Sequence, residues 1–311
     1  MKHNLITSLA LSTILSATQL AAGSNILTDA PTPISQPAGF VPDAGAADRI
    51  RAADRLRTLS QEISAETCLL HNGVLPDQNR SALAHSISEF DGILDALLNG
   101  DPSRHIIGAE ENPKTIREIK AIMTEWAPVQ QIASDVLADP RNASATHAIY
   151  AQSQHLLETT SHLLSELEGE YSHPTEVLMS DMMLIEFAGR QAMLTQKITY
   201  DTCLVWSGFG NQEQVNELKT ICDNFDLIAR ALHDGMPAAG IATAPTDEIR
   251  AALEEVVEDW DDVLAHIEKI AIGGVTDLEN IAWIDQVMTK KMRRMEAIIE
   301  MYVAYSRRAL I

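Results

Sequence analysis

The sequence predicts an all-α protein built as two tandem antiparallel four-helix bundles. The first observation is an internal repeat, because residues 52–73 and 187–208 align with an offset of 135 and nine of the 22 aligned positions are identical. The second is composition, since helix-forming residues dominate from residue 46 onward and no run alternates with the period of a strand. Turn-forming breaks then divide the chain into eight helices, four in each repeat.

The chain begins with a segment typical of a secretory signal peptide. A basic start precedes an apolar run that ends near Leu20, and small residues follow up to Gly23. We therefore expect residues 1–23 to direct export to the periplasm. The alternative, a single membrane anchor, is disfavoured because the run is short for a membrane span. Residues 24–45 hold four prolines and no helical period, so they are expected to form a flexible leader.

Two domains follow from the repeat. We place the first four-helix domain at residues 46–172 and the second at residues 173–311. Helix starts are marked by capping residues such as Asn211 and Thr246, each followed by acidic or amide side chains. The offset also pairs residues outside the best-matched segment: Phe90 with Phe225, Ala96 with Ala231, Gly100 with Gly235 and, after a one-residue shift, Trp126 with Trp260.

The charge balance limits the partners that the chain can have. It carries 44 acidic against 23 basic residues, a net charge of −21, which argues against nucleic acid and against anionic membrane surfaces. Positive charge gathers near the C-terminus, where it either complements a helix C-terminus or docks an acidic partner. The basic residues there are Lys290, Lys291, Arg293, Arg294, Arg307 and Arg308.

The cysteines exclude several kinds of site. There are three, Cys68, Cys203 and Cys222, so in an oxidising compartment at least one thiol stays free or pairs between chains. No CxxC or CxxCH motif occurs, which excludes covalent haem and a zinc ribbon. We expect each cysteine to be a buried, inert thiol, and we expect no cofactor.

The repeated helix has two distinct faces. At 100° per residue, Ile63 and Ile198 fall on an apolar stripe that belongs to the core of each bundle. The far side carries small or hydrogen-bonding residues in both copies, which favours packing against another helix. The alternative is an ordinary half-solvated face. The far-side residues are Arg57, Gln61, Ser64 and Cys68 in the first copy, and Ala192, Gln196, Thr199 and Cys203 in the second.

The same helix resembles a known family. The run AGRQAMLTQKI at residues 188–198 is similar to the helix-1 signature of PilJ/NarX-like sensor domains, and residues 55–61 are a weaker copy. These domains are the periplasmic parts of type IV pilus chemotaxis transducers and of nitrate/nitrite sensor kinases. The resemblance covers both repeats and implies a four-helix bundle for each. In the nitrate sensors it also implies a helix-1 arginine that meets its symmetry mate across a dimer and binds one small anion.

The two copies differ at the arginine that the resemblance singles out. It corresponds to Arg57 in the first repeat and to Ala192 in the second, so a pseudo-dimer within one chain would hold one such arginine. Arg55 and Arg190 are present in both copies; they either contribute to an anion site or are structural, bonded to carboxylates or helix ends. The residues expected at the ligand site are Arg57, Arg55, Arg190, Gln61, Gln196 and Thr195.

Nothing in the sequence indicates catalysis. No catalytic Ser/His/Asp arrangement and no phosphate-binding glycine loop occurs. His147, His155 and His162 share a helix face, but no carboxylate or cysteine stands at matching spacing, so no metal site is expected.

We therefore predict an exported, non-enzymatic tandem sensor-type domain. It would bind a small anion such as nitrate or nitrite, or another small molecule, and relay its state to a membrane receptor or transporter. A second copy of the chain is a further candidate partner, and nucleic acid is not. The alternative is a helical interaction scaffold without a small-molecule ligand.

Overall fold

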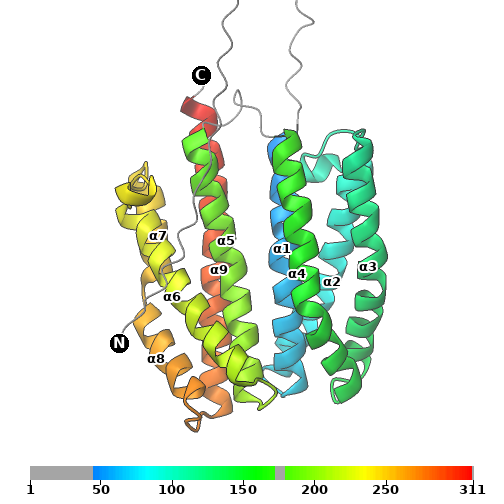
Figure 1. The fold of residues 1–311 in the computed structure, drawn as a ribbon, viewed down its shortest axis with the longest axis vertical. Helices are drawn as coiled ribbons and strands as arrows, with labels where there is room; N and C mark the ends of the chain where they lie inside the picture. Colours follow the sequence, from blue (N-terminus) through cyan, green and yellow to red (C-terminus); the bar gives the residue numbers. More distant parts are fainter. Residues whose placement is uncertain (1–44, 172–178, 310–311) are drawn as a thin grey trace, which may run out of the picture. The chain divides into compact units, whose positions relative to one another are not determined.

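The computed structural model describes residues 45–171 and 179–309, and throughout these residues the chain is all-α (Figure 1). The predicted signal peptide and the predicted leader up to residue 44 lie outside the described residues. No helix in the described part of the chain has the length and apolar character needed to cross a membrane. The α-helices are α1 (Ala46–His71), α2 (Pro76–Asn99), α3 (Pro113–Ala138), α4 (Ala143–Tyr171), α5 (Met179–Trp206), α6 (Gln212–Asp234), α7 (Asp247–Val257), α8 (Trp260–Ala271) and α9 (Leu278–Ala309).

The helices form the two tandem antiparallel bundles that the sequence predicts, α1 to α4 and then α5 to α9 (Figure 1). The described residues hold nine α-helices rather than the eight expected, because the third helix of the second repeat is interrupted. It ends at Val257 and resumes at Trp260, and Asp259 between them has a φ of 59°. The counterpart α3 continues without a break.

A lysine from α9 stabilises this interruption. The Lys291 ammonium donates a 2.7 Å hydrogen bond to the Val256 carbonyl oxygen and a second to that of Glu258, at the free C-terminal end of α7. Arg294 pairs with Glu255 in the same turn of that helix. Lys291 and Arg294 therefore place positive charge at a helix C-terminus, which is one of the two roles that the sequence suggests for the C-terminal basic residues.

Each repeat has its own apolar core, centred on the same aromatic pair. Phe90 and Trp126 stack with ring centroids 4.1 Å apart, and their repeat counterparts Phe225 and Trp260 lie 4.5 Å apart. All four side chains are buried. The end of the second helix is also repeated, because a positive-φ glycine, a 3-10 turn and an isolated bridge follow α2 and α6 alike.

The capping signals at the two predicted helix starts are confirmed. The Asn211 side chain accepts hydrogen bonds from the backbone of Glu213 and Gln214 in a complete capping box. The Thr246 hydroxyl accepts one from the backbone of Ile249. Both helices thus begin where the sequence offers a side chain for their unpaired N–H groups.

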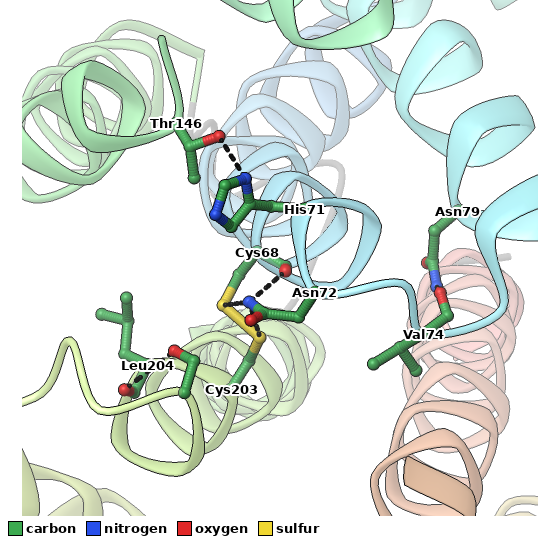
Figure 2. The surroundings of a disulfide bond; sticks show 9 residues. Cys68, His71, Asn72, Val74, Asn79, Thr146, Cys203 and Leu204 are labelled. Carbon is green, nitrogen blue, oxygen red and sulfur yellow. Dashed lines mark hydrogen bonds between the residues drawn. A yellow bond between two sulfur atoms is a disulfide. The ribbon is translucent and has the colours of Figure 1, made fainter. Parts of the chain in front are cut away.

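A disulfide joins α1 to α5, and so joins the two bundles. Cys68 and Cys203 are bonded with their Cα atoms 6.2 Å apart, and the Asn72 amide donates to the Cys68 carbonyl oxygen beside them (Figure 2). The prediction of an inert thiol at these two positions was wrong. Because the residues are repeat-equivalent and lie on the far-side faces, the packing of α1 against α5 brings them together. Cys222 is a buried free thiol.

Candidate ligand-binding clefts

Three of the predicted ligand residues are packed inside the protein. The Gln61 amide donates to the Ser60 hydroxyl at 3.2 Å and to the Ser153 carbonyl oxygen at 3.4 Å. The Thr195 hydroxyl donates to its own helix, and the Gln196 side chain is buried with its Nε2 atom unpaired. None of these three side chains contributes to the cleft that contains Arg55 or to the groove that contains Arg57 and Arg190.

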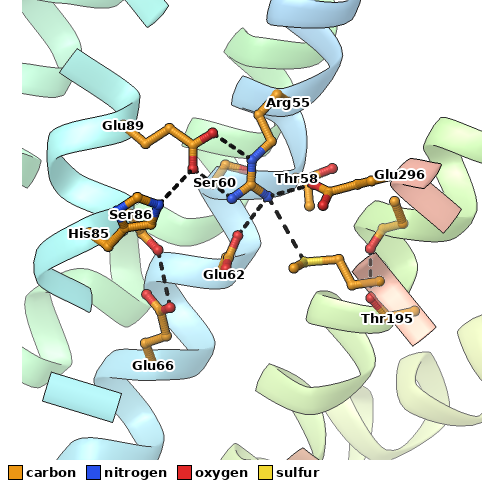
Figure 3. Close-up of polar contacts among 12 residues, drawn as sticks. Arg55, Thr58, Ser60, Glu62, Glu66, His85, Ser86, Glu89, Thr195 and Glu296 are labelled. Atoms are coloured by element: carbon orange, nitrogen blue, oxygen red, sulfur yellow. Dashed lines mark hydrogen bonds and ion pairs between the residues drawn. The ribbon is translucent and has the colours of Figure 1, made fainter. Parts of the chain in front are cut away.

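Arg55 is held by three glutamates from three helices (Figure 3). Its Nε and one terminal nitrogen donate to the two carboxylate oxygens of Glu89 on α2, at 3.1 and 2.8 Å. The other terminal nitrogen lies 2.8 Å from Glu62 on α1 and 3.1 Å from Glu296 on α9. Arg55 is therefore a structural arginine bonded to carboxylates, which is one of the two roles that the sequence allows for it.

The ion pairs of Arg55 favour the charged forms of Arg55 and Glu89, whereas burial raises the pKa of Glu296. Burial alone would lower the pKa of Arg55, but Glu62, Glu89 and Glu296 outweigh it and raise that pKa. Burial raises the pKa of Glu89, yet the hydrogen bonds from Arg55 bring it below its usual value. Glu66, deeper between the helices and bonded by the Ser86 hydroxyl, has a pKa raised well above its usual value, chiefly by burial.

The cleft around Arg55 has a volume of about 650 Å³ and is bounded by α1, α2 and α9, with Ala192 of α5 in its wall. We call it the Arg55 cleft. Its ionisable lining is mixed but acidic, with six carboxylates against four guanidinium groups. The carboxylates are Asp48, Asp54, Glu62, Glu89, Glu296 and Glu300, and the arginines are Arg51, Arg55, Arg104 and Arg293.

Arg57 is also paired, although not fully. One terminal nitrogen lies 2.5 Å from Asp54 and the other donates at 3.1 Å to Glu186 on α5, so this arginine ties the two bundles together. Its side chain is only 7 % exposed, and its Nε–H has no acceptor in the described structure. A buried, unpaired donor is costly, so the Arg57 Nε–H marks a place where the pairing of this arginine is incomplete.

Carboxylates outnumber the cation around Arg57. Burial raises the pKa of Asp54 despite the neighbouring guanidinium. On α4, burial and then the charge of Glu186 raise the pKa of Glu168 to about 7. Near neutral pH this group of acids therefore holds part of a proton, which reduces their mutual repulsion. Gly189 on α5 leaves room for Asp54, because a Cβ there would collide with its carboxylate.

Arg190 has a different environment. It is exposed, and no hydrogen bond or ion pair joins it to any described residue. It lines a groove of about 520 Å³ between α5, α4 and α1, which we call the Arg190 groove. Arg57 lines the same groove, so the structure brings two of the three predicted arginines together. The full lining is Arg57, Gln154, Leu157, Glu158, Ser161, His162, Ser165, Arg190 and Met193.

The internal repeat extends into the fourth helices, α4 and α9. Seven of the buried positions of α9 have buried counterparts in α4 at the same offset of 135, whereas Tyr150 and Leu157, the counterparts of the buried Asp285 and Met292, are half-buried. The seven pair Ile284 with Ile149, Met288 with Ser153, Lys291 with Leu156, Met295 with Thr160, Ile298 with Leu163, Ile299 with Leu164 and Tyr302 with Leu167. Few of these residues are identical, so the shared feature is which positions face the core.

The two clefts are copies of one another. Each is formed by the first helix of one repeat and the fourth helix of the other, and eight of the nine lining residues of the Arg190 groove have an offset-135 counterpart in the Arg55 cleft. The pairs are Arg190 and Arg55, Met193 and Thr58, Arg57 and Ala192, Leu157 and Met292, Glu158 and Arg293, Ser161 and Glu296, His162 and Ala297, and Ser165 and Glu300.

The copies differ in what surrounds the shared arginine. At the positions of Glu62, Glu89 and Glu296, the Arg190 side has Lys197, Asn224 and Ser161, so every carboxylate partner is replaced. Lys197 pairs instead with Asp201 and Glu217 at 3.1 and 3.0 Å. The Arg190 groove thus holds one arginine without a carboxylate partner among the described residues, beside Glu158 and the already paired Arg57, and Arg190 can donate charge-assisted hydrogen bonds to an anion.

The histidines that share a face of α4 do not form a metal site. His155 lies 3.3 Å from Glu125, whereas His147 packs edge-on against the Phe209 ring. His162 lies in the Arg190 groove. Among the described residues, no three His, Cys, Asp or Glu side chains come together in a geometry that could hold a metal ion.

A comparison with protein-family models matches the chain to one family. The type IV pili methyl-accepting chemotaxis transducer N-terminal domain, PilJ, matches residues 43–151 and 176–279. The two matched segments correspond to two tandem copies, one in each bundle. Domains of this family are sensory rather than enzymatic, and they are periplasmic in the transducers. A comparison with curated proteins found no significant match.

Proposed function

The chain belongs to the PilJ family of transducer N-terminal domains, and from this premise we propose that it is an exported sensory module that binds a small anion in the Arg190 groove. The observation that carries this proposal is the unpaired Arg190 guanidinium, in a groove that Arg57 also lines. Its repeat counterpart Arg55 is surrounded by carboxylates, whereas Arg190 is exposed to solvent and no described residue pairs with it. An arginine without a partner in a concave site is available to a ligand.

Export is supported by the disulfide between Cys68 and Cys203 as well as by the predicted signal peptide. Structural disulfides persist in oxidising compartments and are rare in the cytosol. A periplasmic location also agrees with the family, whose N-terminal domains sense ligands outside the cytoplasm.

A relay to a membrane receptor or transporter is the remaining part of the proposal. The Arg190 groove takes residues from both repeats, with Arg57 and Ser161 from the first and Arg190 from the second. A ligand held between them would favour one relative placement of α1, α4 and α5 over others, and a partner could recognise that placement. Without a ligand, the same surfaces would serve the scaffold function.

Thermal-shift screening tests the proposal. Purified protein is melted with nitrate, nitrite, sulfate, phosphate and acetate at constant ionic strength, with chloride as the background salt. An anion at about 100 times its dissociation constant should stabilise the fold by about 2.7 kcal/mol, a shift of several degrees. Arg190→Ala should lose this shift, and Arg57→Ala should show a much smaller one.

Arg230→Ala is the matched control, because Arg230 is a surface arginine paired with Asp226 and Asp261 on α6 and α8, outside both clefts. It should keep the full shift. If no anion stabilises the wild type, or if Arg190→Ala responds like the wild type, the anion-sensor function is wrong. The scaffold alternative then becomes the better account.

A further inference from the structure

We infer, on the basis of the proposed function, that the ligand of the Arg190 groove is a small organic carboxylate and that the Arg55 cleft is the same site with carboxylates built in. The equivalence of the two linings supports this step, because eight residue pairs are related by one offset. The Arg55 cleft supplies carboxylates from its own side chains, and the Arg190 groove leaves the corresponding place open to a carboxylate from solution.

The Arg55 cleft shows which chemistry this arrangement binds. Glu89 accepts from two adjacent nitrogens of Arg55, a two-pronged contact that matches the planar fork of a guanidinium to a carboxylate. Glu296 reaches Arg55 from the fourth helix at 3.1 Å. The repeat thus holds an arginine in a position where carboxylates approach it from two sides.

The Arg190 groove lacks each of these carboxylates but keeps the arginine. Ser161 stands where Glu296 stands in the other copy, and its shorter side chain removes the carboxylate without filling its space. Asn224 replaces Glu89, so the bidentate partner is also gone. A free carboxylate that occupies the place of the Glu296 side chain, above Ser161, would restore one of the pairings that Arg55 has.

The remaining lining favours an organic acid over an inorganic oxyanion. The groove has a volume of about 520 Å³, within the range of small-molecule sites, and Leu157 and Met193 contribute apolar surface to it. A nitrate ion would leave most of this space to water. A carboxylate with a short aliphatic part would place its charge on Arg190 and its carbon atoms against these side chains.

Titration calorimetry with acetate, butyrate and nitrate, at constant ionic strength in chloride, tests the inference on the full chain. We expect butyrate to bind at least ten times more tightly than nitrate. Ser161→Glu should lower butyrate affinity at least tenfold, because it places a carboxylate beside Arg190 as Glu296 does beside Arg55. Ser161→Gln, of similar size but uncharged, should stay within threefold of the wild type.

The outcomes separate this inference from the proposed function. If nitrate binds as tightly as butyrate in an Arg190-dependent manner, the carboxylate class is wrong and the anion sensor stands. If Ser161→Glu keeps butyrate affinity while its circular dichroism and melting match the wild type, the equivalence with Glu296 is wrong. If Ser161→Glu does not fold, Arg190→Ala replaces it as the variant that must lose butyrate binding. If no anion binds the wild type, both proposals fail.

Discussion

Arg55→Ala is expected to lower the free energy of unfolding by about 2 to 4 kcal/mol, whereas Arg190→Ala leaves it within about 0.5 kcal/mol. The two arginines are repeat-equivalent, but only Arg55 has carboxylate partners. Its removal leaves three half-buried glutamates without a cation, and partial exposure of Glu296 moderates the cost. Urea denaturation followed by circular dichroism measures both variants.

A second substitution checks the cause. Glu62→Gln in the Arg55→Ala background removes one of the repelling charges, so it should recover part of the lost stability, while the same change in the wild type should not stabilise. Equal losses for Arg55→Ala and Arg190→Ala would mean that the ion pairs of the Arg55 cleft contribute nothing, and the asymmetry between the clefts would lose its energetic basis.

Removal of the disulfide is expected to cost about 4 kcal/mol. The bond joins residues 135 apart, Cys68 and Cys203, so its loss releases a long loop in the unfolded chain. It also removes the covalent link between α1 and α5, where the two bundles meet. Calorimetric melting of the Cys68→Ser/Cys203→Ser double variant, and of the wild type in a phosphine reductant, should both show a fall of several degrees in Tm.

Cys222→Ser is the control for this experiment. Cys222 is a buried free thiol, so its variant should keep the full sensitivity of the melting temperature to the reductant. Thiol counting under non-reducing, denaturing conditions should find one thiol in the wild type. Three thiols together with a reductant-insensitive melting temperature would contradict the bond between α1 and α5.

The all-α fold could be predicted because its signals are local or repeated. Helix-forming composition, capping at Asn211 and Thr246, and the matched Phe90 and Phe225 all lie in the sequence itself. The interruption between α7 and α8 could not, because neither Glu258 nor Asp259 is a helix breaker. Its stability comes from Lys291, which is distant in sequence.

The disulfide was missed for a related reason. The repeat showed that Cys68 and Cys203 occupy equivalent positions, and helix geometry placed both on the far-side face. Pairing requires in addition that these two faces meet, and that depends on how the bundles pack. An odd number of cysteines was equally compatible with free thiols.

Two residues that line the proposed site were singled out by the sequence. The helix-1 pattern pointed to Arg57 and Arg190, which the structure brings to one groove. It also grouped them with Arg55, which lies in the other cleft because equivalent residues of a pseudo-symmetric pair face different fourth helices. Ser161 was missed because α4 and α9 share few identical residues. The offset of 135 between the repeats pairs Ser161 with Glu296, and buried positions of α4 and α9 follow the same offset.

Titration calorimetry of the wild-type chain with butyrate and with nitrate measures how many anions each chain binds. It tests most directly the claim that the Arg190 groove can bind an anion, whereas the arginine of the Arg55 cleft is already paired with the protein's own carboxylates. We predict one bound anion per chain, and Arg190→Ala should abolish that binding. Two bound anions per chain, or one that survives Arg190→Ala and is lost in Arg55→Ala, would contradict the claim.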